Sequence, residues 1–461
     1  MGIDIDGQDL RGNRFLGLIG KVRAIIGADR PIIFAVLNQL IGAIGMVGSL
    51  YCAGAYFSSE ERGFYFTFSS LIAIQQVLEA GFGQCIVQFA SHEFARLRFA
   101  NYQEVHGDPV ARDRLYSLGR LAAKWYVKLA VGFFFVSLGG GYLFFSAKSS
   151  IGVSWAWGWA VLCLATSLNI LTLPYWYLLE GCIQVSWVNG TRAVGNAVKS
   201  AALCVGIISG FGLMSAGLAA FLYSFVTIAI LLVRWRLFLR AIWKTEIAHS
   251  VSWKEEIWPF QWRIATSWLG GYLSFNLANP MIFGICGPVE AGRFGMAWAA
   301  AQGIGNFAMS WGATKIPRYG MLVAQRSYRE LDKLWNSALV RSIGVSILGS
   351  GILVALLLSL EGLPKYRDRF PPLWQVIVLL LGVVLNQVLF AQAFFLRAHK
   401  REPFLILSLV NGGLIAGGVA LGAYLIGTAG VVLANSIVSV AMVVWGTWIY
   451  TKFRHQYVPA S

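Results

Sequence analysis

The sequence predicts an all-α polytopic membrane protein with about twelve transmembrane helices in two lobes of six. Three observations carry this prediction: about twelve apolar stretches, too few polar residues to cover a soluble globule, and basic residues gathered in alternate loops. The chain of 461 residues is 57% hydrophobic and 13% charged, with a mean hydropathy of +0.64. We therefore look for its function inside the bilayer.

Each apolar stretch is long enough to cross a hydrocarbon core, which takes about 20 apolar residues in a helix. Short polar or charged segments separate the stretches along the whole chain. In chain order, the predicted spans are approximately 32–57, 63–90, 122–146, 155–180, 188–211, 216–239, 257–286, 292–316, 337–360, 372–397, 404–426 and 429–450.

The loops on the predicted outer side are short. The longest, 361–372, has about a dozen residues, whereas a catalytic domain usually has about 50 or more. On the other side, segments 91–121, 240–256 and 317–336 are longer, and their mixture of charged and apolar residues predicts amphipathic helices on the lipid headgroups. No nucleotide-binding domain is recognisable either, so the layout argues against an enzyme.

Basic residues outnumber acidic ones, with 37 Lys and Arg against 21 Asp and Glu. In a soluble protein this balance would favour nucleic acid as a partner. Here, however, roughly four to five times more Lys and Arg fall in one alternate set of loops than in the other. The positive-inside rule then predicts an even number of spans with both termini in the cytoplasm. We expect a multi-pass protein of the cell membrane, the bacterial inner or plasma membrane. Anionic membrane lipids are the expected partners of its basic face, and not nucleic acid.

Six cysteines lie in or at the ends of the apolar stretches. Their spacing matches neither a zinc site nor the disulfide framework of a small secreted domain, so we expect them to pack as small apolar residues. The sequence predicts no metal site and no cofactor.

A weak internal repeat, with an offset of about half the chain, divides the spans into two sets of six. Pro31 opens the first span and Pro259 the seventh, and segment 61–64 (ERGF) resembles segment 290–294 (EAGRF) at the start of the second and eighth spans. Two such halves predict parallel lobes with a cleft between them. The predicted divisions are a cytoplasmic N-terminal segment 1–30, an N-lobe 31–245, a C-lobe 246–450 and a cytoplasmic tail 451–461.

Four short motifs resemble those of polysaccharide exporters in the multidrug, oligosaccharidyl-lipid and polysaccharide (MOP) flippase superfamily: 58–66 (SSEERGFYF), 78–83 (LEAGFG), 177–181 (YLLEG) and 259–265 (PFQWRIA). The resemblance implies a twelve-span fold of two six-helix lobes and alternating access. It also implies transport of a lipid-linked oligosaccharide for O-antigen, capsule or exopolysaccharide synthesis. Other membrane proteins of polysaccharide assembly are the further partners it suggests.

Carrying a sugar pyrophosphate across hydrocarbon requires a wet, cationic cleft, and ionisable residues at membrane depth are its candidates. Lys199, about 16 Å into the fifth span, is either a phosphate contact or a structural lysine with its own partner. Arg263 lies where the resembled family lines its central cleft, and its planar fork suits phosphate; the alternative is snorkelling to the headgroups. Lys315 either snorkels at the cytoplasmic end of the eighth span or meets a substrate phosphate at the entrance.

Further charged candidates come in two pairs. Glu79 and Lys128 are both expected in the cytoplasmic third of neighbouring spans, where they would form a structural salt bridge. The alternative makes Glu79 a protonatable carboxylate that couples ion flow to lobe movement. Arg62 and Arg293 begin the second and eighth spans and either receive a pyrophosphate at the exit or anchor the helices at the interface.

Uncharged polar residues recur in the spans expected to border the cleft. They would either hydrogen-bond sugar hydroxyls or join neighbouring helices, and for any single residue the second role is the commoner. Asn38 and Asn276 are our main substrate candidates. The full set is Asn38, Gln39, Gln75, Gln76, Asn276, Asn279, Gln302 and Asn306.

Two transport functions remain open. The first is a flippase for a polyprenyl-pyrophosphate-linked oligosaccharide. The second is a cation-coupled drug exporter of the same superfamily, which usually needs acidic residues in the first lobe. Within the first six predicted spans there is no Asp, and Glu79 is the one deep carboxylate, so the sequence favours the flippase.

Overall fold

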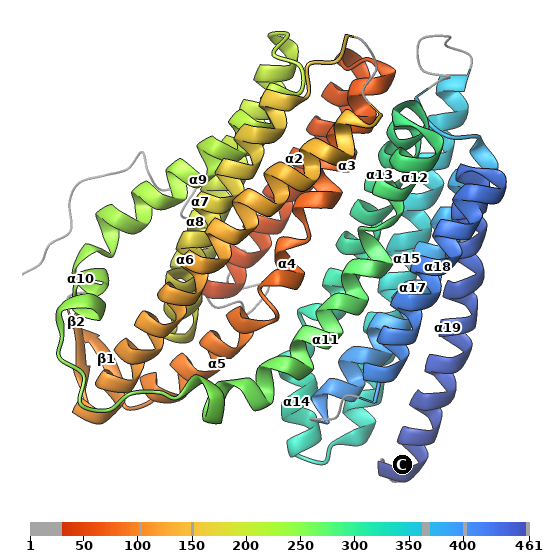
Figure 1. The fold of residues 1–461 in the computed structure, drawn as a ribbon. Helices are drawn as coiled ribbons and strands as arrows, with labels where there is room; N and C mark the ends of the chain where they lie inside the picture. Colours follow the sequence, from red (N-terminus) through yellow and green to blue (C-terminus); the bar gives the residue numbers. More distant parts are fainter. Residues whose placement is uncertain (1–29, 101–103, 149–151, 362–368, 400–402, 458–461) are drawn as a thin grey trace, which may run out of the picture.

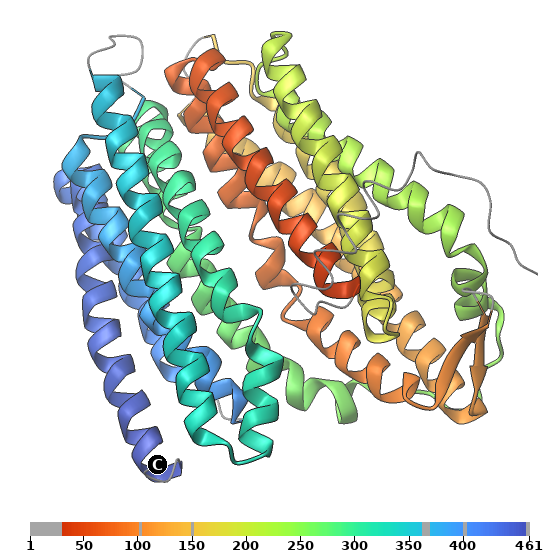
Figure 2. The ribbon, with the colours of Figure 1, turned by 180° about the vertical axis from the view of Figure 1, so that it is seen from behind.

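A computed structural model describes residues 30–100, 104–148, 152–361, 369–399 and 403–457. Two helical bundles stand side by side, close together at one end and splayed at the other (Figures 1 and 2). The first bundle holds helices α2 to α10 and the second holds α11 to α19. Residues 1–29 and 458–461 of the predicted terminal segments lie outside the described residues.

The first bundle covers the first six predicted spans and contains a small hairpin. Its strands β1 and β2 are antiparallel, with Leu97 opposite Gly107. Its elements are α2 (Arg30–Tyr56), α3 (Ser59–Ile72), α4 (Gln75–Leu78), α5 (Phe82–Phe94), β1 (Leu97–Ala100), β2 (Glu104–Gly107), α6 (Pro109–Ser146), α7 (Ala156–Gly181), α8 (Val185–Ile208), α9 (Met214–Arg234) and α10 (Arg236–Lys244).

A connecting segment leads from α10 to the second bundle and ends in one turn of π-helix, η1 (Trp253–Ile257). The six further predicted spans follow. The elements of this bundle are α11 (Trp258–Phe275), α12 (Ala278–Cys286), α13 (Pro288–Ala313), α14 (Ile316–Ala324), α15 (Tyr328–Glu361), α17 (Leu373–Ala398), α18 (Leu405–Ile426) and α19 (Thr428–Tyr457).

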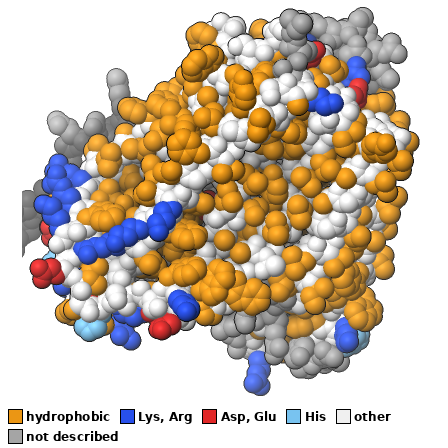
Figure 3. All heavy atoms as spheres, viewed as in Figure 1, with side chains coloured by type: hydrophobic (Ala, Val, Ile, Leu, Met, Phe, Trp, Pro, Cys, Tyr) orange, Lys and Arg blue, Asp and Glu red, His pale blue; other side chains and the backbone are white. Residues whose placement is uncertain are grey.

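Each of the predicted spans coincides with a helix or with a broken run of helices. In the described part of the chain, 8 helices are long and apolar enough to cross a membrane by themselves, or 9 when the bent run from α3 to α5 is counted. Apolar side chains cover most of the visible surface, with charged groups gathered toward its ends (Figure 3). The chain is an all-α polytopic membrane protein.

One local expectation is wrong. Segment 91–121 contains the β1–β2 hairpin and the first turns of α6 instead of a separate amphipathic helix. The hairpin ends at Gly107, and Asp108 and Pro109 then cap and open α6. The predicted cytoplasmic tail from residue 451 is helical through Tyr457, since α19 continues without a break.

The second pass is broken, and its sequence explains both ends. Ser58 caps α3 in a capping box with Glu61, so the helix starts sharply. At the other end, Ala80 and Gly81 have positive φ angles of 50° and 67°, and the pass bends by 46° there. A Cβ at Gly81 would also collide with Ile264 of α11, at 2.2 Å from its nearest side-chain carbon, so glycine is required twice over.

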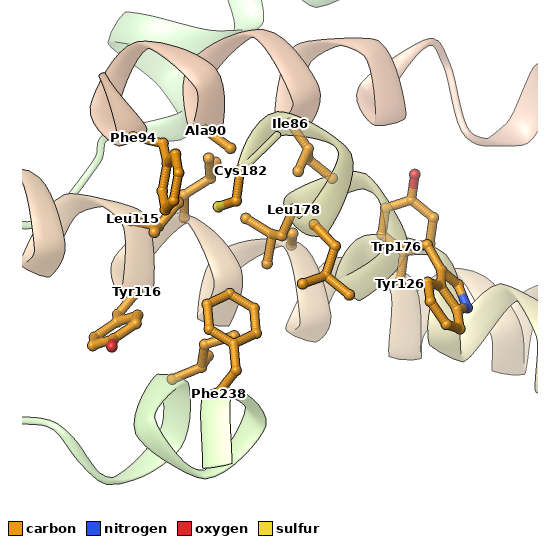
Figure 4. Packing of buried hydrophobic residues seen from close by; sticks show 14 of the residues in the cluster. Ile86, Ala90, Phe94, Leu115, Tyr116, Tyr126, Trp176, Leu178, Cys182 and Phe238 are labelled. Carbon is orange, nitrogen blue, oxygen red and sulfur yellow. The ribbon is translucent and has the colours of Figure 1, made fainter. Parts of the chain in front are cut away.

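The core of the first bundle lies toward the end that carries the hairpin. Ile86, Ala90 and Phe94 of α5 pack against Leu178 and Cys182 of α7, with residues of α6 and α10 closing the cluster (Figure 4). Phe238 and Ile242 fix the amphipathic α10 onto this core, and both are fully buried. Burial of these side chains holds the connecting segment near the first bundle.

The two bundles meet where α3 packs along α13. Gly63, Gly292 and Gly295 permit the close approach, because a Cβ at any of them would lie within 3.0 Å of an atom in the opposite helix or its N-terminal turn. Asn279 of α12 and Thr67 of α3 are both buried and hydrogen-bonded to each other at 3.0 Å. We call this the closed end, because the two bundles touch here at the N-terminal turns of α3 and α13. The opposite end, with the hairpin, η1 and α14, is called the basic end.

Candidate functional site

A cavity of about 780 Å³ lies between the two bundles. Helices α3 and α4 form one wall, and α11, α12, α13 and α17 form the others. It sits beyond the α3–α13 contact of the closed end, along the middle of α13 from Gly295 to Met309. A cavity of this size accommodates a sizeable organic molecule.

Side-chain amides are the characteristic polar groups of this cavity. Five of the eight polar candidates from the sequence line it: Gln76, Asn276, Asn279, Gln302 and Asn306. They come from both bundles, since Gln76 belongs to α4 and the others follow α11 or lie in α12 and α13. Asn279 is 2% exposed, and its side chain is hydrogen-bonded to Thr67 of the other bundle, so it acts as an interhelical link.

Aromatic side chains supply most of the remaining wall. The break in the seventh predicted span shapes it, because α11 ends at Phe275 and α12 begins at Ala278, so the backbone carbonyl of Phe275 lies at a helix end. The indole of Trp298 donates to that carbonyl at 3.1 Å, which fixes the ring beside the cavity. The aromatic lining residues are Phe66, Trp268, Tyr272, Phe275, Trp298 and Phe390.

Arg397, in the last turn of α17, is the charged residue that the structure adds to this site. It is exposed to the cavity, and among the described lining residues none is acidic. The sequence contained a signal, because Arg397 is the one charged residue in the apolar stretch 373–398. As the last residue of the predicted span 372–397, it could not be told from an arginine that snorkels to the headgroups.

A second cavity of about 230 Å³ adjoins the first inside the second bundle. The two share Gly271, Phe275, Phe390 and Arg397, so Arg397 stands between them. Ser274, Asn386, Ser408 and Asn411 give the smaller cavity polar walls, and the Asn411 amide donates to the Ser274 hydroxyl at 2.9 Å. The guanidinium therefore reaches an environment with oxygen acceptors on one side and aromatic rings on the other.

Of the three cations expected to contact phosphate, two do not line this cavity, and the side chain of the third is not described. Lys199 lies near the middle of α8 with an exposed side chain, but it is not among the residues lining the central cavity. Lys315 is half-buried at the junction of α13 and α14 and is not part of that lining. Arg263 belongs to α11, but its side chain lies outside the described part of the structure.

The expected ion pair between Glu79 and Lys128 is not formed. The Glu79 carboxylate is 8% exposed and accepts hydrogen bonds from the hydroxyls of Tyr177 (3.1 Å) and Tyr126 (3.3 Å). Lys128 is exposed on the opposite side of α6. Helical phase gives the reason, because successive residues turn by about 100°, so a residue two positions after the inward-facing Tyr126 points outward.

The two arginines expected at an exit mouth both lie at the closed end. Arg62 is buried, and its guanidinium donates to the carbonyl of Phe57 (3.0 Å) and the hydroxyl of Ser59 (3.1 Å). Arg293 forms an ion pair with Glu290 at 2.8 Å. Both therefore stabilise helix starts in this conformation, and contact with a substrate stays a prediction.

Asn38 also has a partner other than the central cavity. Its carbonyl oxygen accepts a hydrogen bond from the Asn196 amide at 3.0 Å, which joins α2 to α8. It is half-buried and does not line the cavity described above. This is the interhelical role that the sequence left open as the alternative.

Comparison with known proteins identifies the fold. The structure resembles an inward-facing multidrug resistance MATE family transporter of the MOP superfamily, with a TM-score of 0.63, 15% identity, and coverage of 91% of this chain and 99% of the other. The fold is that of the MATE transporters. An outward-facing MATE transporter gives a TM-score of 0.51 at 16% identity, covering 93% and 97% of the two chains.

A mutant of the Vibrio cholerae MATE transporter VcmN resembles the chain with a TM-score of 0.55, 13% identity, and coverage of 93% and 98%. No protein-family model matches the sequence, and no curated protein matches it. The MATE-type fold thus comes from the structure, while the polysaccharide branch rests on the short motifs.

Proposed function

We propose that this protein exports a polyprenyl-pyrophosphate-linked oligosaccharide across the membrane by alternating access, for the synthesis of a cell-surface polysaccharide. The observation that carries the proposal is the lining of the central cavity. Amides and aromatic rings surround it, Arg397 enters it, and none of its described lining residues is acidic. A cationic drug would find no countercharge in this lining, whereas an anionic sugar phosphate would find a cation.

The amides and rings suit a sugar. Amide groups both donate and accept hydrogen bonds, as sugar hydroxyls require, and the apolar faces of sugar rings stack on aromatic side chains. Gln76, Asn276, Gln302 and Asn306 provide the amides from both bundles. A cargo that contacts both bundles can link their relative movement to its own passage.

Alternating access is supported by the asymmetry of the two ends. At the closed end α3 and α13 touch through glycines, whereas the bundles diverge toward the basic end (Figure 1). The inward-facing relative also fits better than the outward-facing one, with TM-scores of 0.63 and 0.51. If the basic end is cytoplasmic, as charge predicts, this conformation would load its cargo from the inner leaflet.

One observation favours the second candidate, a cation-coupled drug exporter. The relatives of similar fold are multidrug transporters by name, and the first bundle contains the buried carboxylate of Glu79. That carboxylate faces Tyr126 and Tyr177 inside the bundle and is not part of the cavity lining. It would therefore act as a coupling group and not as a drug contact.

Reconstituted liposomes distinguish the two. A fluorescent polyprenyl-pyrophosphate oligosaccharide should be translocated, and Arg397→Ala should slow translocation by roughly tenfold or more, because a hydrogen bond to a charged group is worth about 1.5–3 kcal/mol. Arg397→Lys should retain part of the rate. Arg341→Ala removes an exposed arginine of α15 and serves as the matched control, with an unchanged rate.

The same vesicles should be tested with a cationic dye. Export of the dye together with no movement of the glycolipid would overturn the proposal in favour of drug export. An unchanged glycolipid rate in Arg397→Ala would remove Arg397 from the cargo path.

A further inference from the structure

Two lysines project from an apolar, outward-facing surface of the first bundle. Lys124 and Lys128 are both exposed and lie one turn apart on α6. Their neighbours on the same surface are apolar and exposed, with Val127 at 51% and Val131 at 52%. Figure 3 shows Lys and Arg side chains along the otherwise apolar face of this bundle.

The described part of the chain supplies these lysines with no countercharge, since none of its carboxylates lies within 4.0 Å of either ammonium group. Their like charges also repel each other, because residues four apart on a helix are neighbours. Two adjacent ammonium groups on an apolar surface, with no carboxylate of the described residues beside them, can therefore accept an external anion.

Their depth follows from the length of α6. The helix has 38 residues and ends at Ser146, whereas a hydrocarbon core takes about 20 residues. Counting back from Ser146 places the boundary of the core near residue 126, roughly between the two lysines. Both ammonium groups can thus reach the headgroup layer at the basic end, at the level of the lipid phosphates.

Trp125 gives this surface a fixed wall. Its ring stacks on Trp253 of η1, with centroids 6.0 Å apart, and Trp253 in turn packs against Trp258 at 5.1 Å. Phe82 of α5 supports the ring edge-on at 6.4 Å. The indole is 38% exposed, so it is held in place by its neighbours while one part remains open to a ligand.

We propose that Lys124, Lys128 and Trp125 form a binding site for the headgroup of an anionic phospholipid from the surrounding leaflet. The lysines supply the positive charge that the phosphate requires, and the indole packs against the start of the acyl chains, as tryptophan does at membrane interfaces. The site lies at the seam between α6 and the connecting segment, since Trp253 belongs to that segment. It is separate from the central cavity and does not depend on the cargo.

Lipid quenching tests the site. The variant Val131→Cys carries a bimane label and is placed in nanodiscs of phosphatidylcholine. Quenching of the bimane is compared between spin-labelled phosphatidylglycerol and spin-labelled phosphatidylcholine. The same labelling of the protein without Val131→Cys gives the background from its native cysteines. Because a basic residue near the surface gives roughly a fivefold preference for anionic lipid, we expect a preference of roughly 25-fold for phosphatidylglycerol. In the double variant Lys124→Gln/Lys128→Gln, the preference for phosphatidylglycerol over phosphatidylcholine should fall to about twofold or less.

Two matched variants test whether the cationic pair itself is responsible. Lys333→Gln/Lys452→Gln removes the same charge from exposed lysines of the second bundle and should keep the preference. Lys124→Arg/Lys128→Arg should also keep it and shows that the surface still folds around a cationic pair. The proposal is overturned if the wild-type protein shows no preference, if the glutamine pair retains it, or if either matched variant loses it.

Discussion

Gly292 on α13 lies directly against Gly63 on α3, so closely that a Cβ at Gly292 would come within 2.8 Å of the Gly63 backbone nitrogen. The reverse contact is tighter, because a Cβ at Gly63 would lie 1.9 Å from the carbonyl oxygen of Pro288. Both obstacles are backbone atoms, which cannot move aside as a side chain can. The contact between the bundles therefore exists only while both positions are glycine.

Gly63→Ala should shift the protein away from this conformation. The methyl group cannot fit against Pro288, so the closed end must separate. Spin labels on Tyr56→Cys and Ile285→Cys, both exposed near that end, should lie farther apart on average in Gly63→Ala, as measured by pulsed electron paramagnetic resonance. Gly132→Ala, where nothing lies within 4 Å, is the control and should leave the distance distribution unchanged.

Thr67→Val should weaken the closed end without a steric clash. Thr67 and Asn279 are both buried, and their hydrogen bond joins α3 to α12 across the bundles. Valine matches threonine in shape but removes the hydroxyl that is hydrogen-bonded to the Asn279 side chain, at a cost of about 0.6–1.5 kcal/mol. Thermal unfolding in detergent should show the loss, and Ser69→Ala, an exposed change on the same helix, should show none.

Tyr177→Phe and Glu79→Gln should separate a structural from a coupling role for the buried carboxylate. Removal of the Tyr177 hydroxyl takes away a 3.1 Å hydrogen bond, so stability should fall by roughly 1 kcal/mol. Under the proposed function, Glu79→Gln keeps an acceptor for both tyrosines and leaves glycolipid translocation near the wild-type rate. Loss of all translocation in Glu79→Gln, with the protein still folded, would instead support ion coupling through this residue.

Glu256 should make stability depend on pH in the acid range. It lies in η1, where the Ser252 amide donates to it at 3.0 Å and Arg114 forms an ion pair at 2.5 Å, and these interactions lower its pKa below the ordinary 4.5. A lowered pKa in the folded state means that the contribution is complete above the unfolded value and is lost as the pH falls through the folded value. The thermal midpoint should therefore drop below roughly pH 4.5, and less steeply in Glu256→Gln.

The span layout was predictable because each pass needs a long apolar run, and that requirement is visible in composition alone. The helices α8 and α13, which each contain two charged residues, also coincide with predicted spans, 188–211 and 292–316. The similar segments 61–64 and 290–294 contain Gly63 and Gly292, which the structure places in contact. The sequence could not tell that these glycines face each other across the two bundles.

Side-chain direction was the part that could not be predicted. Glu79 and Lys128 were matched by depth alone, yet the rotation of α6 turns Tyr126 toward Glu79 and Lys128 away from it. The amides of the cavity were found as a group, because they recur in the right spans, but Asn38 and Asn279 proved to bond to other helices. Arg397 was missed because a residue at the end of a span reads as a loop residue until the neighbouring helices are placed.

Because of the break at Ala80 and Gly81, the two parts of the second predicted span pack on different bundles. Its first part, α3, packs mainly on α13 of the second bundle, whereas its last part, α5, packs on α6 and α7 of the first. If the bundles move relative to each other as rigid bodies, α3 has to follow the second bundle while α5 follows the first. The chain between α3 and α5 must then change its conformation. The positive φ angles of Ala80 and Gly81, beside Ile264, mark the place where a change of backbone angles has to absorb that movement.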